Sequence, residues 1–267
     1  MSRTAIRDTH LFISDTQSSR TPIVFSHGLL WSHKMYDRVI QDLKKEFRCI
    51  AYDHRGQGES APVTTRTVPI EQITEDAIAL IESLDIGPVH FVGLSMGGFV
   101  GMRIAARRPD LIRRLVLIST ASEEEPAKNH KKYRLLNAVT RLFGVRVVAS
   151  SVMPIMFGES FLNDPSRRTE QTQWRNELIR NRRDVTKAVQ GVIERHDVTH
   201  ELQHISCPTL ILHGSEDRAI APKRAKQMAE IIPNATWQQT HKGGHSLPLE
   251  CPEFVVTQLQ QFFRGLK

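Results

Sequence analysis

The sequence predicts an α/β fold: a mostly parallel sheet flanked by helices, with an inserted helical lid. Two observations lead to this prediction. From residue 22 onward, short apolar runs alternate with amphipathic helical patterns, which is typical of consecutive βαβ units. The alternation gives way to helical patterns alone at about residue 121, and it resumes after residue 206. A chain of 267 residues is long enough for one large α/β domain that carries an insertion.

The first part of the predicted sheet comes from four apolar runs separated by helical patterns. Each run is short and rich in Val, Ile, Leu or Phe, as expected for a buried strand. Pro109 ends the last of the helices, because proline cannot continue the helical hydrogen bonds. The strands are predicted at 22–26, 47–52, 89–94 and 114–118, and the helices at 35–45, 70–84 and 95–108.

The second part of the sheet follows the helical insertion. Strands are predicted at 209–213 and 235–240, and helices at 222–232 and 252–263. We therefore expect an α/β core made of residues 1–120 and 207–267, and a helical cap, or lid, made of residues 121–206. Open α/β sheets bind ligands at the carboxyl ends of their strands, so the lid is expected above that edge.

The composition is that of an ordinary globular protein, with 40% hydrophobic and 24% charged residues. A net charge of +7 raises the possibility of a nucleic-acid partner, but the basic residues are short pairs interleaved with acids, as on solvated helix faces. Three cysteines without a CxxC pair predict neither disulfides nor a metal cluster. The amino terminus lacks the apolar core of a signal peptide, and no apolar stretch reaches the length of a membrane helix. We expect a cytoplasmic protein that binds neither nucleic acid nor a membrane.

The segment Gly93-Leu94-Ser95-Met96-Gly97 places a serine between a predicted strand and a predicted helix. This is the context of the G-x-S-x-G nucleophile elbow, in which the serine sits on a sharp, strained turn. Such a turn is tolerated only where neighbouring side chains are nearly absent, and Gly93 and Gly97 meet that need. The amino terminus of the following helix would also favour negative charge beside Ser95. Ser95 is therefore the candidate nucleophile.

Acyl transfer also requires hydrogen-bond donors for an oxyanion. In the elbow arrangement, one donor is the backbone amide of the residue after the serine, here Met96. The second is expected in the loop after the first buried strand, where Gly28 permits an unusual turn and Leu29 offers its amide. His27, at the end of that strand, is expected to brace the loop rather than to act as a base.

The general base must come from 12 histidines. His245 lies on a glycine-rich loop between the last strand and the last helix, at the same sheet edge as Ser95. His241 is its rival, but it precedes the glycines. His245 is therefore the candidate base.

The acid that orients the histidine is expected at another strand end. Asp217 follows the strand at 209–213 and completes the order serine, acid, histidine that this architecture uses. Glu216 lies one residue away, and the glutamates at 123–125 follow the fourth strand as a weaker alternative. Asp217 as a helix cap near Pro222 is a further, structural alternative.

Five segments together resemble the α/β-hydrolase superfamily. The segment 89–121 resembles in particular its 3-oxoadipate enol-lactonase and carboxylesterase branch. The resemblance implies that Ser95 is the nucleophile, His245 the base and then the acid, and Asp217 its partner, with the Leu29 and Met96 amides as the oxyanion site. The turn at 53–60 is expected to be architectural. The five segments are HG at 27–28, DHRGQGES at 53–60, GLSMGG at 93–98, GSEDRAIAP at 214–222 and GGH at 243–245.

The predicted activity is that of a serine hydrolase that cleaves a small carboxylic ester or lactone through an acyl-enzyme on Ser95, without a cofactor. Haloalkane dehalogenases and epoxide hydrolases of the superfamily use an aspartate at this position, so the serine argues against both. A carbon–carbon hydrolase, a perhydrolase or a cofactor-independent dioxygenase with the same triad stays open. So does a receptor-like protein that binds a small ligand and hydrolyses it slowly.

Apolar residues after the oxyanion loop and within the lid are candidates for the wall of the substrate pocket. We interpret the basic residues of the lid as surface charge rather than as a selector for an anionic substrate. The candidate wall residues are Leu30, Trp31, Met153, Met156, Phe157 and Trp174.

Overall fold

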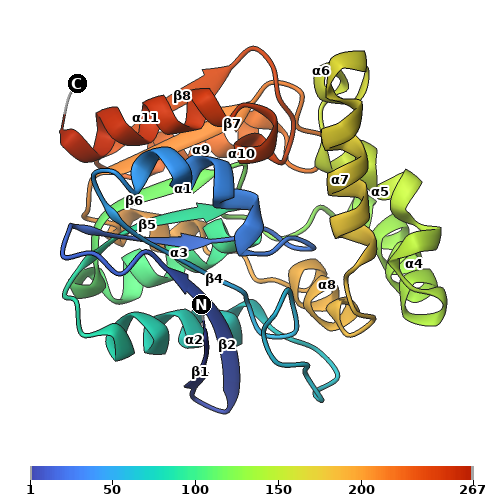
Figure 1. Cartoon of the computed structure of the whole chain (residues 1–267), viewed down its shortest axis with the longest axis horizontal. Helices are drawn as coiled ribbons and strands as arrows, with labels where there is room; N and C mark the ends of the chain where they lie inside the picture. Colours follow the sequence, from blue (N-terminus) through green and yellow to red (C-terminus); the bar gives the residue numbers. More distant parts are fainter. Residues whose placement is uncertain (1, 266–267) are drawn as a thin grey trace.

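The centre of the computed structural model, which describes residues 2–265, is one sheet of eight strands. The strand order is β1-β2-β4-β3-β5-β6-β7-β8, and the strands from β3 to β8 all run parallel (Figure 1). β1 and β2 pair antiparallel at one edge. The strands are β1 (Ser2–Ile6), β2 (Thr9–Asp15), β3 (Pro22–Ser26), β4 (Arg48–Tyr52), β5 (Val89–Leu94), β6 (Ile112–Ile118), β7 (Thr209–Gly214) and β8 (Ala235–Thr240).

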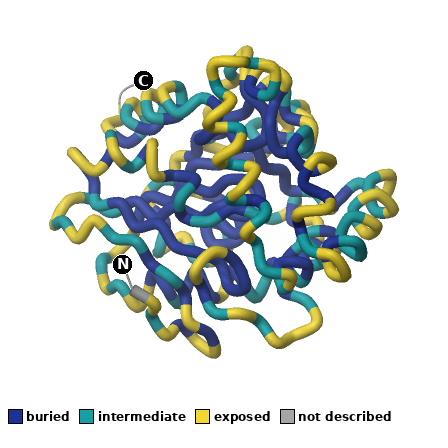
Figure 2. Tube along the Cα trace, turned by 45° about the vertical axis from the view of Figure 1, so that its right-hand side comes forward, coloured by how far each residue is buried: buried dark blue, intermediate teal, exposed yellow. Residues whose placement is uncertain are grey.

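Helices cover both faces of the sheet, because alternate strand residues point to opposite sides. In β6, Leu115 and Leu117 pack into one half of the core with α2, α3 and α9, whereas Val116 and Ile118 pack into the other half with α1 and α11. Figure 2 shows the buried strands enclosed by partly exposed helices. These flanking elements are η1 (His33–Tyr36), α1 (Asp37–Leu43), α2 (Ile70–Leu84), α3 (Met96–Arg107), η2 (Pro109–Leu111), α9 (Pro222–Ile231), α10 (Leu247–Glu250) and α11 (Pro252–Arg264).

Between β6 and β7 lies a stretch of 119–208 that we call the helical segment. Every described element in it is an α-helix or a 3-10 helix. α4 to α7 stand beyond the sheet, on the right in Figure 1. The elements are α4 (Ala127–Phe143), η3 (Val145–Val147), α5 (Ala149–Met156), α6 (Glu159–Leu162), η4 (Pro165–Arg167), α7 (Arg168–Ile179), α8 (Val185–Ile193) and η5 (Thr199–His204).

The predicted fold class is confirmed, and two local features differ from the prediction. The hairpin of β1 and β2 was not expected, because its outward-facing polar residues make the amino terminus read as a polar segment. β2 nevertheless alternates, with Leu11 and Ile13 buried and His10 exposed. The helix expected at 35–45 begins as the 3-10 helix η1 and continues as α1 only from Asp37.

The parallel register aligns the carboxyl ends of the central strands at one edge. Ser26 of β3 pairs with Gly93 of β5, and Leu94 of β5 pairs with Ile118 of β6. Ile118 in turn neighbours Leu212 of β7. The loops that follow β3, β5, β7 and β8 therefore start close together, which is what a site assembled from distant parts of the chain requires.

Candidate active site

Ser95 occupies a strained turn between β5 and α3. Its φ of 51° and ψ of −110° are rare for a residue with a side chain, and it forms the N-cap of α3. The Ser95 amide donates to the Ile118 carbonyl at 2.9 Å, and the Thr120 hydroxyl donates to the Ser95 carbonyl at 2.9 Å. These bonds to the end of β6 hold the turn in a conformation that it would not adopt alone.

Two glycines make this turn sterically possible. A Cβ on Gly93 would lie 2.2 Å from the Gly97 carbonyl oxygen, and a Cβ on Gly97 would lie 2.1 Å from the Ser26 carbonyl oxygen. Both contacts are with backbone atoms, which cannot move aside as a flexible side chain can. The sequence analysis assigned these glycines to a turn that leaves no space for side chains. The structure shows the reason: three backbone segments approach each other closely at this point.

His245 and Asp217 form a buried hydrogen-bonded pair at the same edge. The His245 Nδ1 lies 2.9 Å from the Asp217 Oδ2, and both residues are less than a tenth exposed. Burial alone would raise the pKa of Asp217, but the neighbouring histidines His245 and His213 and their hydrogen bonds hold it well below its usual range. Since a charged Asp217 accepts from Nδ1, the Nε2 atom of neutral His245 is left as a proton acceptor.

His213 contacts the candidate acid Asp217, and the sequence analysis did not identify it. Its Nε2 lies 2.9 Å from the Ile220 carbonyl oxygen and 3.2 Å from the Asp217 Oδ2. The other Asp217 oxygen accepts from the amides of Ala219 and Ile220 at 2.8 and 2.9 Å. The sequence did contain a signal for this contact: a histidine ends an apolar strand and lies four residues before the candidate acid.

The alternatives to this pair are directed elsewhere. His241 is exposed, whereas His245 is buried. Glu216 accepts hydrogen bonds from the amide and the hydroxyl of Ser160 in the helical segment. Of the glutamates at 123–125, Glu123 pairs with Arg224 at 3.1 Å and Glu125 with Arg195 at 2.9 Å.

The loop after β3 lies against the elbow, as the oxyanion prediction requires. A Cβ on Gly28 would lie 3.5 Å from the Ser95 Cβ. Within residues 2–265, neither the Leu29 amide nor the Met96 amide donates a hydrogen bond to a loop, a helix cap or a side chain. His27 braces this loop as expected: its Nδ1 lies 2.8 Å from the Gly28 carbonyl oxygen, and its Nε2 accepts from the His54 amide at 3.0 Å.

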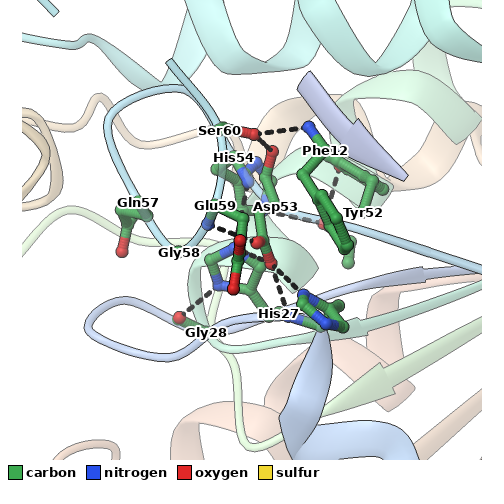
Figure 3. Close-up of polar contacts among 12 residues, drawn as sticks. Phe12, His27, Gly28, Tyr52, Asp53, His54, Gln57, Gly58, Glu59 and Ser60 are labelled. Carbon is green, nitrogen blue, oxygen red and sulfur yellow. Dashed lines mark hydrogen bonds and ion pairs between the residues drawn. The ribbon is translucent and has the colours of Figure 1, made fainter. Parts of the chain in front are cut away.

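The turn at 53–60 is organised around the buried carboxylate of Asp53 (Figure 3). Asp53 accepts from the His33 amide at 2.6 Å and from the Glu59 amide at 2.7 Å. The same turn reaches the candidate oxyanion loop, because the Gln57 Oε1 accepts from the Leu30 amide at 3.0 Å. Leu30 has a positive φ of 70°, so this bond fixes an unusual conformation beside Leu29. The turn is architectural, and it also shapes the site.

Ser95 and His245 line one cavity of about 140 Å³ beneath the helical segment. Its wall is largely aliphatic and aromatic, with Leu29 and Ser95 at its floor and residues of α4, α5 and α8 above. The lining residues are Leu29, Leu30, Ser95, Phe99, Glu125, Tyr133, Leu136, Asn137, Thr140, Val145, Val148, Val152, Ile155, Met156, Val189, Val192, Ile193, Arg195, Ala219, Ile220 and His245.

Of the six residues predicted for the pocket wall, Leu30 and Met156 line this cavity and four do not. Trp31 is anchored instead by its Nε1, which donates to the Ser246 hydroxyl at 3.1 Å, and it meets Phe157 and Trp174 edge to face. Met153 belongs to the same packed layer. The four side chains pack between the helical segment and the core. The prediction was wrong for this cavity because large apolar residues can serve packing as well as line a pocket.

One charged pair among the cavity-lining residues was not expected. Arg195 and Glu125 are both buried and lie 2.9 Å apart, and the Arg195 guanidinium stacks 4.5 Å from the Phe99 ring centroid. Pairing makes the burial of both charges tolerable. The pair joins the end of α8 to the start of the helical segment.

Glu250 is another buried carboxylate beside the site, and the sequence analysis did not identify it. It accepts from the amides of Gly158, Gly244 and Ser246 at 2.8, 2.9 and 3.1 Å. Burial raises the pKa of Glu250 to about 7, although these three donors favour its charged form. Gly244 and Ser246 flank His245, so Glu250 ties the histidine loop to the helical segment.

Residues 2–265 contain no candidate membrane span and no candidate metal centre. No helix there is both long and apolar enough to cross a bilayer. No group of three or more His, Cys, Asp or Glu residues in this range is arranged to hold a metal ion.

The sequence and the fold are similar to those of known proteins. A family model described as the alpha/beta hydrolase fold matches residues 21–252. A protein of Caulobacter sp. (strain K31) named "Putative carbamate hydrolase RutD" is 26% identical over 252 residues, which cover 93% of this chain and 92% of the relative. A protein of the same name from Pseudomonas syringae pv. syringae (strain B728a) is 27% identical, over 91% of this chain and 93% of its own.

Two solved structures are similar along nearly the whole chain. A thermophilic esterase from Thermogutta terrifontis, solved with malate bound, superposes with a TM-score of 0.89 at 28% identity and covers 98% of this chain and 96% of its own. The enol-lactonase from Burkholderia xenovorans LB400 gives a TM-score of 0.91 at 24% identity, over 98% of this chain and 100% of its own. The second likeness concerns the fold alone.

Proposed function

The chain belongs to the α/β-hydrolase fold family, and from this premise we propose that it is a serine hydrolase that cleaves a small carboxylic ester or lactone through an acyl-enzyme on Ser95. The observation that supports this proposal most is the hydrogen-bonded pair of His245 and Asp217, whose histidine shares a cavity with the strained Ser95. The similarity to an esterase at 28% identity supports the same reaction class.

The first half of the reaction forms the acyl-enzyme. His245 Nε2 takes the proton of the Ser95 hydroxyl as its oxygen attacks the carbonyl carbon of the ester, and the amides of Leu29 and Met96 hold the oxyanion. The tetrahedral intermediate collapses when the carbon–oxygen bond to the alcohol breaks, and His245 gives its proton to that leaving oxygen. For a lactone, the alcohol stays attached to the acyl chain.

The second half returns the free enzyme. His245 takes a proton from water, the water oxygen attacks the acyl carbon, and the bond to Ser95 breaks as the serine regains its proton. Asp217 stays charged throughout and keeps Nδ1 of His245 protonated, so that Nε2 faces the reacting atoms. The low pKa of Asp217 supports this role.

We also propose that the helical segment acts as the lid of a core made of residues 1–120 and 207–267, with residues 121–206 as the cap. The helical segment contributes 14 of the 21 residues that line the cavity, and ten of them belong to α4, α5 and α8. A volume of about 140 Å³ resembles cavities that hold one benzene molecule, which are about 150 Å³. The acyl group that fits without movement of the lid is therefore small and largely apolar.

The proposal is tested with a panel of matched substrates: a short-chain nitrophenyl ester, a lactone and a carbamate. We expect the ester or the lactone to be turned over, and Ser95→Ala to reduce kcat by about 10⁴-fold or more. Ser150→Ala, at an exposed serine of α5, is the matched control. A folded wild-type protein that binds these compounds saturably but hydrolyses none would contradict the proposal and favour the receptor-like alternative.

The carbamate in the panel addresses the names of the two curated relatives. A carbamate carbonyl can form the same tetrahedral intermediate on Ser95, so the geometry of the site accommodates it. A kcat/KM higher for the carbamate than for the ester of the same size would move the substrate class from ester to carbamate and leave the role of Ser95 unchanged.

A further inference from the structure

The outer surface of α4 and η3 has an unusual composition. Four of the five large hydrophobic residues that are exposed in the described part of the chain lie there: Leu135, Leu142, Phe143 and Val147, each more than half exposed. Apart from these four and Ala127, all exposed residues between Ala127 and Val147 are basic. We call this surface the α4 face. Its basic residues are Lys128, Lys131, Lys132, Arg134, Arg141 and Arg146.

The charge of the α4 face is not compensated locally. Residues 127–147 contain six Lys and Arg and no Asp or Glu. Across residues 2–265, none of these six cations lies within ion-pair distance of a carboxylate, whereas Arg107, Arg167 and Arg182 of neighbouring elements each pair with one. The face is therefore a concentrated positive patch rather than part of a balanced charged surface.

The opposite side of the same helix roofs the cavity. Tyr133, Leu136, Asn137 and Thr140 follow the spacing of one helix face and line the cavity wall. The exposed Leu135 and Leu142 are seven residues apart, so they share the outer side of α4. In Figure 1, α4 lies at the edge of the molecule that is farthest from the sheet. Its outer side is thus accessible to a large, flat partner.

We propose that the α4 face docks on an anionic lipid surface, with Leu142, Phe143 and Val147 entering the boundary between headgroups and acyl chains. Apolar residues framed by Lys and Arg are the pattern of helices that lie in a membrane interface. The surrounding cations attract the negative headgroups of anionic lipids. The sequence analysis expected no membrane partner because it found no spanning segment; a peripheral contact needs none.

Other occupants fit the face less well. A second copy of this chain would bring two sets of six cations together, which opposes association. Three of the six cations of the α4 face are lysines, a residue type that is depleted in protein interfaces. The proposal goes beyond the proposed hydrolase activity and does not depend on it, because lipid binding is measured without turnover.

The test is sedimentation of the full-length protein with vesicles of phosphatidylcholine, alone or mixed with an equal amount of phosphatidylglycerol. We expect binding to the anionic vesicles at least tenfold tighter than to the neutral ones. The paired variant Leu142→Ser with Phe143→Ser should weaken it at least tenfold, and so should Lys131→Glu with Lys132→Glu. The control, Lys223→Glu with Lys226→Glu on α9, changes the net charge equally at exposed positions of the core and should have less than a twofold effect.

Several results would overturn the proposal. They are no binding of the folded wild type to anionic vesicles, an equal loss in the α9 control, or no effect of the Leu142 and Phe143 changes. Dimerisation without lipid that these two changes abolish would assign the face to a second copy. Binding to poly-glutamate but not to vesicles would assign it to an acidic protein. Circular dichroism verifies that each variant is folded.

Discussion

The carboxyl edge of the sheet and the helical segment above it are built on different principles. At the edge, backbone contacts dictate the residues: Gly93 and Gly97 stand where a Cβ would come within about 2.2 Å of a carbonyl oxygen. In the helical segment, apolar side chains of many kinds could enclose a cavity of the same size, and within residues 2–265 the six cations of its α4 face form no ion pair. The comparison suggests that the edge determines the reaction and the helical segment determines the substrate and the surroundings.

This division predicts that changes at the edge alter catalysis for every substrate. Asp217→Asn should lower kcat by about 10³-fold, because a neutral amide at this position cannot hold the histidine in the tautomer that leaves Nε2 free. The loss should be similar for all substrates of the panel. Steady-state kinetics measure it.

Glu216→Gln is the matched control for this change, since Glu216 is the adjacent carboxylate and bonds to Ser160 instead. Its effect on kcat should stay below about tenfold. If Glu216→Gln were the more damaging of the two, the assignment of the acid would be wrong.

The second prediction concerns the backbone contacts under Ser95. Gly97→Ala should reduce the free energy of unfolding by about 3 kcal/mol or more, because the new methyl group would overlap the Ser26 carbonyl oxygen and neither backbone segment can withdraw. Denaturant unfolding measures the change. Gly87→Ala is the control: its φ is +69°, which strains any side chain, but no atom lies within 4 Å of the added Cβ, so a cost of only about 1 kcal/mol is expected. Equal costs would mean that steric contact at the elbow is unimportant.

The third prediction uses Glu250, which connects the two regions. Its folded pKa of about 7 lies above the ordinary glutamate value of 4.5, so the folded state holds this proton more tightly than the unfolded state. The stability that follows is fully present below pH 4.5 and is lost as the pH rises through about 7. A shift of this size corresponds to roughly 3 kcal/mol.

Glu250→Gln removes this titration. Between pH 5 and 8, the difference in unfolding free energy between wild type and variant should therefore change by about 2 kcal/mol or more, in favour of the variant at the higher pH. Denaturant unfolding at several pH values measures the difference, with Glu253→Gln at an exposed position as the control. If the unfolding free energies of wild type and Glu250→Gln changed in parallel with pH, the raised pKa of Glu250 would be contradicted.

The fourth and smallest effect is expected from the cavity wall. Val152→Phe adds volume inside the cavity and should lower kcat/KM about tenfold for an ester with a six-carbon acyl chain, but less than threefold for an acetyl ester. Val147→Phe adds the same volume on the exposed outer side. It should change neither value. A uniform loss for both esters would mean that the helical segment does not select by size.

The sequence predicted the edge better than the helical segment, for physical reasons. A strained turn such as that of Ser95 admits few residue types, so its glycines are visible as a local pattern. The same holds for the strands β3 to β7, whose apolar runs reflect burial on both faces. The hairpin of β1 and β2 was missed because half of each strand faces outward and is polar.

Contacts between distant parts of the chain were not predictable in this way. Glu250 and the pair of Arg195 with Glu125 are each explained by a partner that only the folded structure brings near, since Gly158 is 92 residues from Glu250 in the chain. Trp31, after β3, and Trp174, in α7, show the same limit. Their size and apolar character fit a pocket wall, but they meet edge to face and do not line the cavity that holds Ser95.

Covalent labelling of Ser95 tests the central claim most directly. A fluorophosphonate reacts with a serine hydroxyl only where a base and oxyanion donors activate it, so it reports the assembled edge independently of the substrate. Digestion and mass spectrometry of the labelled wild-type protein should give one adduct, on the peptide that contains Ser95. Ser95→Ala should give none, and Asp217→Asn should react far more slowly. A folded wild-type protein that remains unlabelled, or that carries its adduct on another serine, would contradict the account.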